Sequence, residues 1–148
     1  MGIYMLDTNI ASHVIKGDIP EVRQRLVKVP MHEVAVSVIT QAELLYGVAK
    51  RGHPRGLETK VREFLARVAV MPWTQDVGEV YADLRARCEA AGVTLPPMGM
   101  MIAAHAEALD RASEGSDSAA ILVTRDRIFS RIPGGIRLED WTAEPGNH

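Results

Sequence analysis

The chain has one cysteine among 148 residues, few aromatic residues and no long apolar run. A single thiol excludes an internal disulfide and any metal cluster built from several thiolates. No apolar stretch approaches the roughly 20 residues that a membrane-spanning helix needs. The N-terminus also lacks the basic segment and apolar core of a secretory signal. We therefore expect a reduced, cytoplasmic protein without membrane contact, in which Cys88 is a buried thiol on the apolar stripe of a helix.

Neither sign of charge dominates, because 17 basic residues stand against 19 acidic ones and give a formal net charge of −2. This balance excludes a polycation, so any contact with nucleic acid has to come from a local patch. Basic residues gather at Lys50–Arg55 and at Arg125–Arg131. Such runs are usually solvated faces, but Arg125 and Arg127 flank Asp126, an acid that shortly follows an apolar run. We take these two as candidate contacts with the phosphates of a nucleic acid.

Short apolar runs alternate with amphipathic stretches along the chain. The runs predict strands at 3–6, 34–39, 68–71, 121–123 and about 136–138. Helical spacing predicts helices at 8–16, from Pro20, from Thr40, at 57–68, at 77–92 and at 97–111, with a polar loop at 112–119. Strands separated by helices indicate a parallel sheet covered on both faces. We predict the α/β class, as one three-layer α/β/α domain over residues 1–141 with a flexible tail over 142–148.

Three acidic residues come shortly after predicted strands. Asp7 directly follows the first strand, Glu43 lies one turn into the helix after the second, and Asp126 follows the strand that ends near Thr124. The carboxyl ends of parallel strands meet at one edge of a sheet, where ligands usually bind. Acids gathered there suit a hard divalent cation. The sequence therefore predicts a metal site, with Thr124 as a second polar group lining it.

Each of these acids also has an ordinary structural explanation. Asp7 is a good N-cap for the helix that follows it. Thr40 and Glu43 have the spacing of a capping box, in which the acid folds back onto the start of its own helix. Asp126 is a common turn residue. The metal hypothesis rests on the three acids together, since none of them is decisive alone.

Other residues with possible metal chemistry fit the core better. His105 lies in an apolar helical segment, and no second histidine follows it at a spacing of three or four residues. It is therefore interpreted as structural, and no zinc site is expected. The methionines Met98, Met100 and Met101 are interpreted as apolar packing rather than as a soft-metal site.

Several segments resemble the PIN-domain ribonucleases and, within them, the VapC toxins of bacterial toxin–antitoxin pairs. The matching segments occur in family order and cover nearly the whole chain. They are Met5–Asn9, Ser37–Gly47, Ile102–Ala106, Val123–Asp126, and Arg131–Gly134 followed by Arg137–Trp141.

The resemblance implies an α/β/α fold and a Mg²⁺-dependent endoribonuclease, with Mn²⁺ as an alternative cation, that cleaves structured RNA such as tRNA or rRNA. It also implies a homodimer held inactive by a VapB-type antitoxin. Asp7 and Glu43 match two acidic metal ligands, and Asp126 matches a fourth acid of some members. Thr8 and Thr124 would help to position metal, water or phosphate. Mg²⁺ suits such a site, since it keeps several waters and takes few carboxylates.

One family residue is missing. The family pattern Gly-Pro-x-Asp-x-x-Ile-Ala-Ala-His carries a third invariant acid, and Gly99 occupies its place here. Glycine early in a helix costs about 1 kcal/mol relative to alanine, and no turn needs its freedom here. Asp110, the next acid on this helix, is about 16 Å further along the axis and cannot replace it. The chain is therefore expected to be an inactive or weakened VapC-like toxin.

Two other classes of function compete with this one. A non-catalytic PIN module would bind antitoxin or RNA without metal-dependent turnover. A phosphotransfer domain would need a second acid beside Asp7 or two residues after it, together with a well-placed lysine. Thr8 and Asn9 occupy those positions, which argues against phosphotransfer.

Overall fold

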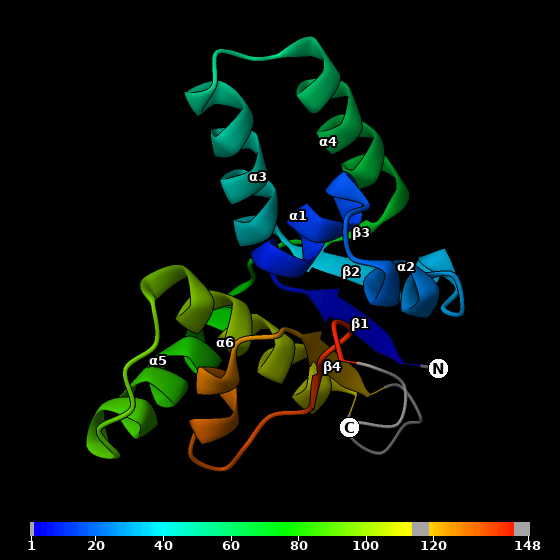
Figure 1. Cartoon of the computed structure of the whole chain (residues 1–148). Helices are drawn as coiled ribbons and strands as arrows, with labels where there is room; N and C mark the ends of the chain where they lie inside the picture. Colours follow the sequence, from blue (N-terminus) through cyan, green and yellow to red (C-terminus); the bar gives the residue numbers. More distant parts are fainter. Residues whose placement is uncertain (1, 114–118, 144–148) are drawn as a thin grey trace.

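The computed structural model describes residues 2–113 and 119–143 and shows a sheet between two layers of helices (Figure 1). The strands are β1 (Ile3–Leu6), β2 (Val34–Ser37), β3 (Ala69–Met71), β4 (Ala120–Val123) and β5 (Leu138–Glu139). They form one sheet in the order β3-β2-β1-β4-β5, and all four pairings are parallel. The predicted α/β class and three-layer parallel architecture are confirmed.

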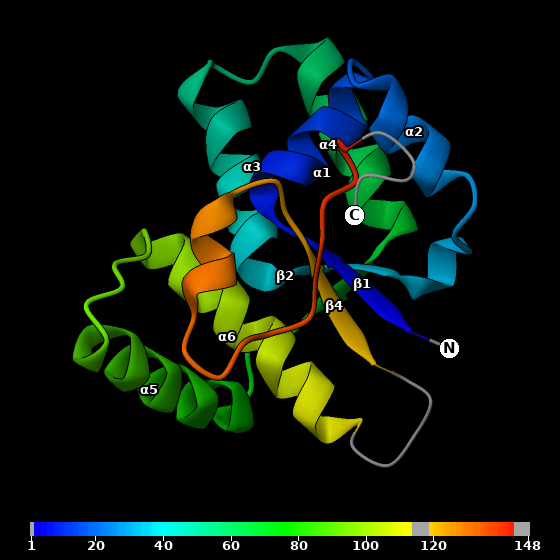
Figure 2. The ribbon, with the colours of Figure 1, turned by 60° about the horizontal axis from the view of Figure 1, so that its bottom comes forward.

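Helices cover both faces of the sheet (Figures 1 and 2). One face carries α1 (Thr8–Lys16), α2 (Pro20–Leu26), α3 (Val38–Lys50) and α4 (Arg55–Arg67), and the other carries α5 (Gln75–Ala90) and α6 (Pro97–Ala112). Two short 3₁₀ helices, η1 (Met31–Glu33) and η2 (Arg127–Arg131), complete the set. Within β1, Met5 packs with the α5–α6 core and Leu6 with the opposite core, as alternating strand side chains must.

β1 is the central strand, and its register places three chain segments at one edge. Leu6 lies opposite Val36 of β2 and opposite Val123 of β4. The Asp7 N–H continues this ladder by donating to the Val123 carbonyl at 3.0 Å. The residues that follow β1, β2 and β4 therefore start from the same carboxyl edge, which is where the sequence placed its candidate site.

The boundary between β2 and α3 differs from the prediction. β2 ends at Ser37 instead of residue 39, and α3 begins at Val38 instead of Thr40. Ser37 is the N-cap, because its Oγ accepts the Ile39 N–H at 3.1 Å. The capping-box explanation of Thr40 and Glu43 is therefore wrong, since both residues lie inside the helix. The cause is local: a serine hydroxyl at the strand end satisfies the helix start before the threonine is reached.

Ser37 also holds the buried His105, whose Nδ1 lies 2.7 Å from the Ser37 Oγ. Burial lowers the pKa of His105, opposed by a backbone hydrogen bond to Pro72, so the neutral ring is favoured. The ring of Trp73 packs edge-on against it. His105 is thus structural, as predicted.

Ser37→Ala is expected to lower the free energy of unfolding by about 2 kcal/mol, because it removes a helix cap and leaves the buried His105 without this partner. Thr74→Ala is the matched control, since Thr74 caps α5 through a longer bond of 3.4 Å and does nothing else. Urea denaturation of both variants measures the difference. Equal losses would show that the contact between Ser37 and His105 contributes nothing.

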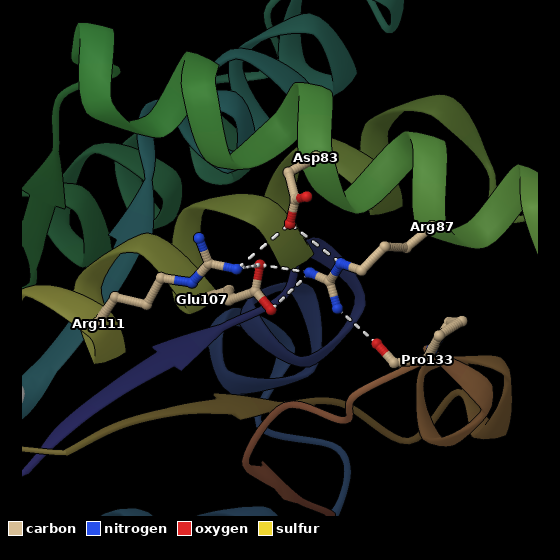
Figure 3. A network of polar contacts seen from close by, with 5 residues as sticks. All are labelled: Asp83, Arg87, Glu107, Arg111 and Pro133. Atoms are coloured by element: carbon tan, nitrogen blue, oxygen red, sulfur yellow. Dashed lines mark hydrogen bonds and ion pairs between the residues drawn. The ribbon is translucent and has the colours of Figure 1, made fainter.

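An ion-pair network joins α5, α6 and the turn after η2 (Figure 3). Arg87 Nη2 donates to both carboxylate oxygens of Glu107, at 2.8 and 2.9 Å, and its Nε donates to Asp83 at 3.0 Å. Its Nη1 donates to the Pro133 carbonyl. Arg111 lies 3.4 Å from both Glu107 and Asp83. Burial opposes the charge of Arg87, but Glu107 and Asp83 raise the pKa of its guanidinium. The network fixes the η2 turn against the helix pair.

Of the remaining predictions from the sequence, some are confirmed, one is confirmed only in part, and others fall outside the described residues. Cys88 is buried, as expected, and burial raises the pKa of its thiol. Met100 is buried, whereas Met98 is 49% exposed, so the methionine cluster is only partly a packing feature. In the predicted tail, the Thr142 N–H and hydroxyl both donate to Asp140, and residues 144–148 lie outside the described residues. Most of the predicted loop at 112–119 also lies outside them. Within the described ranges, the helices are too short or too polar to cross a membrane.

Candidate active site at the carboxyl edge of the sheet

Asp7 caps a helix and also lies at the carboxyl edge of the sheet, so its role as a cap does not remove it from the candidate site. It is the N-cap of α1, and its Oδ1 accepts the Ile10 N–H at 2.8 Å. Only 8% of the residue is exposed. The cap needs a single acceptor bond, so the carboxylate keeps further acceptor capacity for another group.

The environment of Asp7 disfavours its negative charge. Burial raises the pKa of the carboxyl group, and the nearby negative charge of Asp126 raises it further. The Thr124 hydroxyl, the Ile10 N–H and the charge of Arg125 lower the pKa and offset part of this effect. Asp7 forms no ion pair with a basic side chain in the described part of the chain. A buried carboxylate of this kind is stabilised by a cation.

Glu43 is positioned by a pair of threonine hydroxyls. Thr8 Oγ1 donates to Glu43 Oε1 at 2.6 Å and lies 3.1 Å from Thr40 Oγ1. Thr8 has one proton, which goes to Glu43, so Thr40 is the donor in the second bond. This pairing ties the start of α1 to the second turn of α3. Sequence reasoning named Thr8 but missed the positioning role of Thr40, although its place one turn before Glu43 was a usable signal.

Asp126 has the turn role that its alternative explanation gave it. It is exposed and is the N-cap of η2, where its Oδ1 accepts the Ile128 N–H at 3.0 Å. Its own N–H donates to Thr124 Oγ1 at 3.1 Å. Thr124 is buried, and its hydroxyl group forms hydrogen bonds with both the Asp7 carboxylate and the Asp126 N–H. Arg125 and Arg127 are exposed on either side of Asp126.

The three predicted acids do not form a ready-made cluster. Across residues 2–113 and 119–143, no three Asp, Glu, His or Cys side chains are gathered so that they could hold a metal ion. Glu43 is held by Thr8, and Asp126 bonds to its own turn. Mg²⁺ nevertheless needs only one or two carboxylates when water fills its other positions. Asp7 is buried, has no basic ion-pair partner in the described part of the chain and lies beside the Thr124 hydroxyl. Such a carboxylate fits a hydrated cation.

Gly99 lies against the segment that carries Asp126. It is the third residue of α6, and a Cβ added there would lie 3.3 Å from Cζ of Phe129 and 3.8 Å from Cδ of Pro96. Phe129 belongs to η2 and is buried. A side chain at position 99 would therefore be in tight contact with the aromatic ring of η2, the short helix that Asp126 caps. Sequence reasoning missed Phe129, although an aromatic residue inside the basic run 125–131 was a signal that this segment packs inward.

Comparisons with known proteins identify the family. The PIN domain family matches residues 4–135. The tRNA(fMet)-specific endonuclease VapC of Salmonella typhimurium is 32% identical over 93% of this chain and 97% of its own length. Ribonuclease VapC2 of Rickettsia felis is 31% identical over 94% and 98%.

Solved structures give the same answer. The DNA-bound VapBC structure from Salmonella typhimurium matches with a TM-score of 0.81 and 32% identity, covering 95% of this chain and 99% of that one. VapBC2 from Rickettsia felis, bound to a promoter DNA fragment, matches with a TM-score of 0.77 and 32% identity over 94% and 98%. The chain therefore belongs to the PIN-domain family and, within it, to the VapC-type ribonuclease toxins of VapBC systems.

Proposed function

We propose that this chain is a VapC-type toxin built for Mg²⁺-dependent endonucleolytic cleavage of structured RNA, and that Gly99 leaves this activity weak or absent. Mn²⁺ is the alternative cation. The observation that carries the proposal is Asp7, a buried and unpaired carboxylate at the carboxyl edge of a PIN-domain sheet. The relative named for tRNA(fMet) makes tRNA, with rRNA as a second candidate, the RNA class to test first.

Asp7 would hold the cation, and Glu43 and Asp126 would contribute to the site through bound water, since the three acids are not gathered closely enough in the described structure to bind one ion together. A divalent cation in such a site supplies Lewis acidity and a water molecule of lowered pKa. Thr8 keeps the Glu43 carboxylate in place through its 2.6 Å bond. Thr124 orients Asp7 and also accepts the Asp126 N–H.

The exposed guanidinium groups of Arg125 and Arg127 flank the site, and neither forms an ion pair within the described ranges. They are therefore available to the phosphates on either side of the cleaved bond, as charge-assisted contacts.

The partners follow from the same family membership. Several similar solved structures are VapBC complexes, which supports a VapB-type antitoxin as the protein partner of this chain. We also propose a homodimer, and a cytoplasmic location because tRNA and rRNA are there.

A second candidate function is a non-catalytic module that binds RNA or antitoxin. Two observations favour it: the acids are not gathered into a three-ligand site, and Phe129 packs where a third acid would begin. Such a module would keep the fold and the partner surfaces but lose metal-dependent turnover.

Asp7→Asn is expected to abolish the stabilisation of this chain by Mn²⁺ and to raise its Tm in EDTA at neutral pH. Burial raises the pKa of Asp7, so the folded state loses stability as pH rises through that pKa, and asparagine removes this cost while keeping the helix cap. In the wild type, Mn²⁺ at one hundred times its Kd should add about 2.7 kcal/mol. Thermal unfolding with and without Mn²⁺ measures both effects.

Asp76→Asn is the matched control, because Asp76 is an exposed acid in the first turn of α5, far along the chain from the site. It should keep the Mn²⁺ shift of the wild type. An equal Mn²⁺ shift in Asp7→Asn and the wild type would show that Asp7 does not hold the cation.

A further inference from the structure

The outer face of α3 runs directly from the candidate site to an exposed basic end. Glu43, Tyr46 and Lys50 are spaced three and four residues apart, so their side chains share one helix face. Lys50 lies about 10 Å along the axis from Glu43. α3 and α4 project together from the sheet, and the loop that joins them forms the far end of this projection (Figure 1). A polymer leaving the site along α3 therefore passes Tyr46 before it reaches Lys50.

The aromatic ring of Tyr46 is exposed on this face of α3. Its exposed fraction is 65%, and it makes no hydrogen bond or ring contact with any other described residue. Its exposed neighbours one turn away include Ala42 and Ala49, whose small side chains leave those sides of the ring uncovered, and Lys50. Nothing in the described fold uses this ring.

Gly47 supports an external role for the same surface. It lies inside α3, where glycine costs about 1 kcal/mol relative to alanine. A Cβ added at Gly47 would meet nothing within 4 Å, so packing inside the chain does not require glycine. The missing side chain opens the helix backbone beside Tyr46 to a ligand that approaches from outside.

The charge beyond Tyr46 matches a polyanion. Lys50, Arg51 and Arg55 are exposed, and none of them has an acidic partner among the residues that the structure places. The sequence from Leu44 to Leu57 contains no acidic residue. Unpaired cations beside an uncovered aromatic ring are the combination that binds single-stranded nucleic acid, by phosphate contact and base stacking.

We propose that this face of α3 is a subsite for single-stranded RNA, in which one base stacks on Tyr46 and the adjoining phosphates bind Lys50 and Arg51. The subsite rests on the proposed function, since it uses the same RNA, and it extends that function to an unpaired segment of the substrate beside the cleaved bond. Continuity with Glu43 favours RNA over a protein partner as the occupant.

The test is fluorescence anisotropy in EDTA with a fluorescein-labelled RNA hairpin that carries a single-stranded loop, so that no cleavage interferes. Tyr46→Ala and Tyr46→Leu are expected to bind about tenfold more weakly than the wild type, because both lose the stacking ring. Tyr46→Phe should bind like the wild type. Lys50→Ala and Arg51→Ala should each reduce the slope of log affinity against log salt by about 0.7.

Two controls define the effect. Val27→Ala removes another exposed apolar side chain, 76% exposed at the end of α2, and should leave the RNA affinity unchanged. A fully paired RNA duplex, which offers no unstacked base, should bind Tyr46→Ala and the wild type equally. Equal hairpin affinities for the wild type, Tyr46→Ala and Tyr46→Leu would overturn the subsite.

The outcomes separate this inference from the proposed function. A wild-type chain that does not bind the hairpin at all would contradict both RNA as substrate and the subsite. Hairpin binding that is insensitive to Tyr46 would contradict the subsite alone. Unchanged RNA affinity together with a changed sedimentation coefficient in Tyr46→Ala would assign this face to contact between two copies of the chain.

Discussion

Gly99→Asp is expected to raise Mg²⁺-dependent RNA cleavage by about 100-fold or more over this chain, because losing a ligand should cost at least as much as losing an outer-shell partner of a ligand, which costs about 10–100-fold. Position 99 is in the first turn of α6, where a carboxylate is also favoured by the positive end of the helix dipole. The neighbouring segment carries Asp126, which already acts on Asp7. A carboxylate at residue 99 would therefore add a further acid beside the segment that carries Asp126.

Phe129 sets the condition for this gain. A Cβ at residue 99 lies 3.3 Å from Cζ of Phe129, so the buried ring has to move by a few tenths of an ångström. Adding Phe129→Leu to Gly99→Asp removes the closest ring atoms. If this contact limits the placement of the new carboxylate, the double variant should cleave faster than the single one.

Two substitutions at residue 99 isolate the carboxylate. Gly99→Ala adds the Cβ and the helix propensity without an acid, and Gly99→Asn adds nearly the shape of aspartate without its charge. Cleavage rates and Mn²⁺ affinities of the three variants give the comparison. Only the aspartate variant should gain activity. A rate for Gly99→Asp no higher than that of Gly99→Asn would refute the interpretation of Gly99 as a lost ligand.

The sequence predicted which edge of the sheet the three acids follow, because strand ends can be recognised from apolar runs that stop at polar residues. Asp7, Glu43 and Asp126 all follow strands that the structure contains, and β1 is central between the other two. Chain direction and parallel pairing were enough for this prediction, since they do not depend on side-chain detail. The same pattern predicted the parallel sheet itself.

The connections between side chains were beyond the sequence. Serine and threonine are both good capping residue types, and the sequence alone does not show that Ser37 rather than Thr40 begins α3. The contact of Ser37 with His105, from a distant helix, is equally invisible in the sequence. The bond from Thr8 to Glu43 likewise joins residues on two helices whose relative rotation no local pattern gives. Phe129 reads as one aromatic residue in a basic run until α6 is placed beside it.

Arg87→Ala is expected to lower the free energy of unfolding by about 2–3 kcal/mol, which is at or just below the lower end of the range for breaking a fully buried ion pair, because about a quarter of the Arg87 side chain meets water. Glu107 is only 9% exposed and would keep just the longer contact with Arg111. The Pro133 carbonyl would lose its guanidinium donor at the same time. For a domain of this size the expected fall in Tm is about 10 °C, measured by circular dichroism.

Arg85→Ala is the matched control, because Arg85 is on the same helix and pairs with Glu89 entirely at the surface. It should leave the Tm unchanged. A second variant, Arg87→Met combined with Glu107→Leu, replaces the pair with apolar side chains and should recover most of the stability that Arg87→Ala loses, since no buried charge remains unpaired. If the double variant is as unstable as Arg87→Ala, the lost stability comes from the bond to Pro133. The network then acts chiefly by fixing the turn after η2. Phe129, which contacts Gly99, belongs to η2 itself.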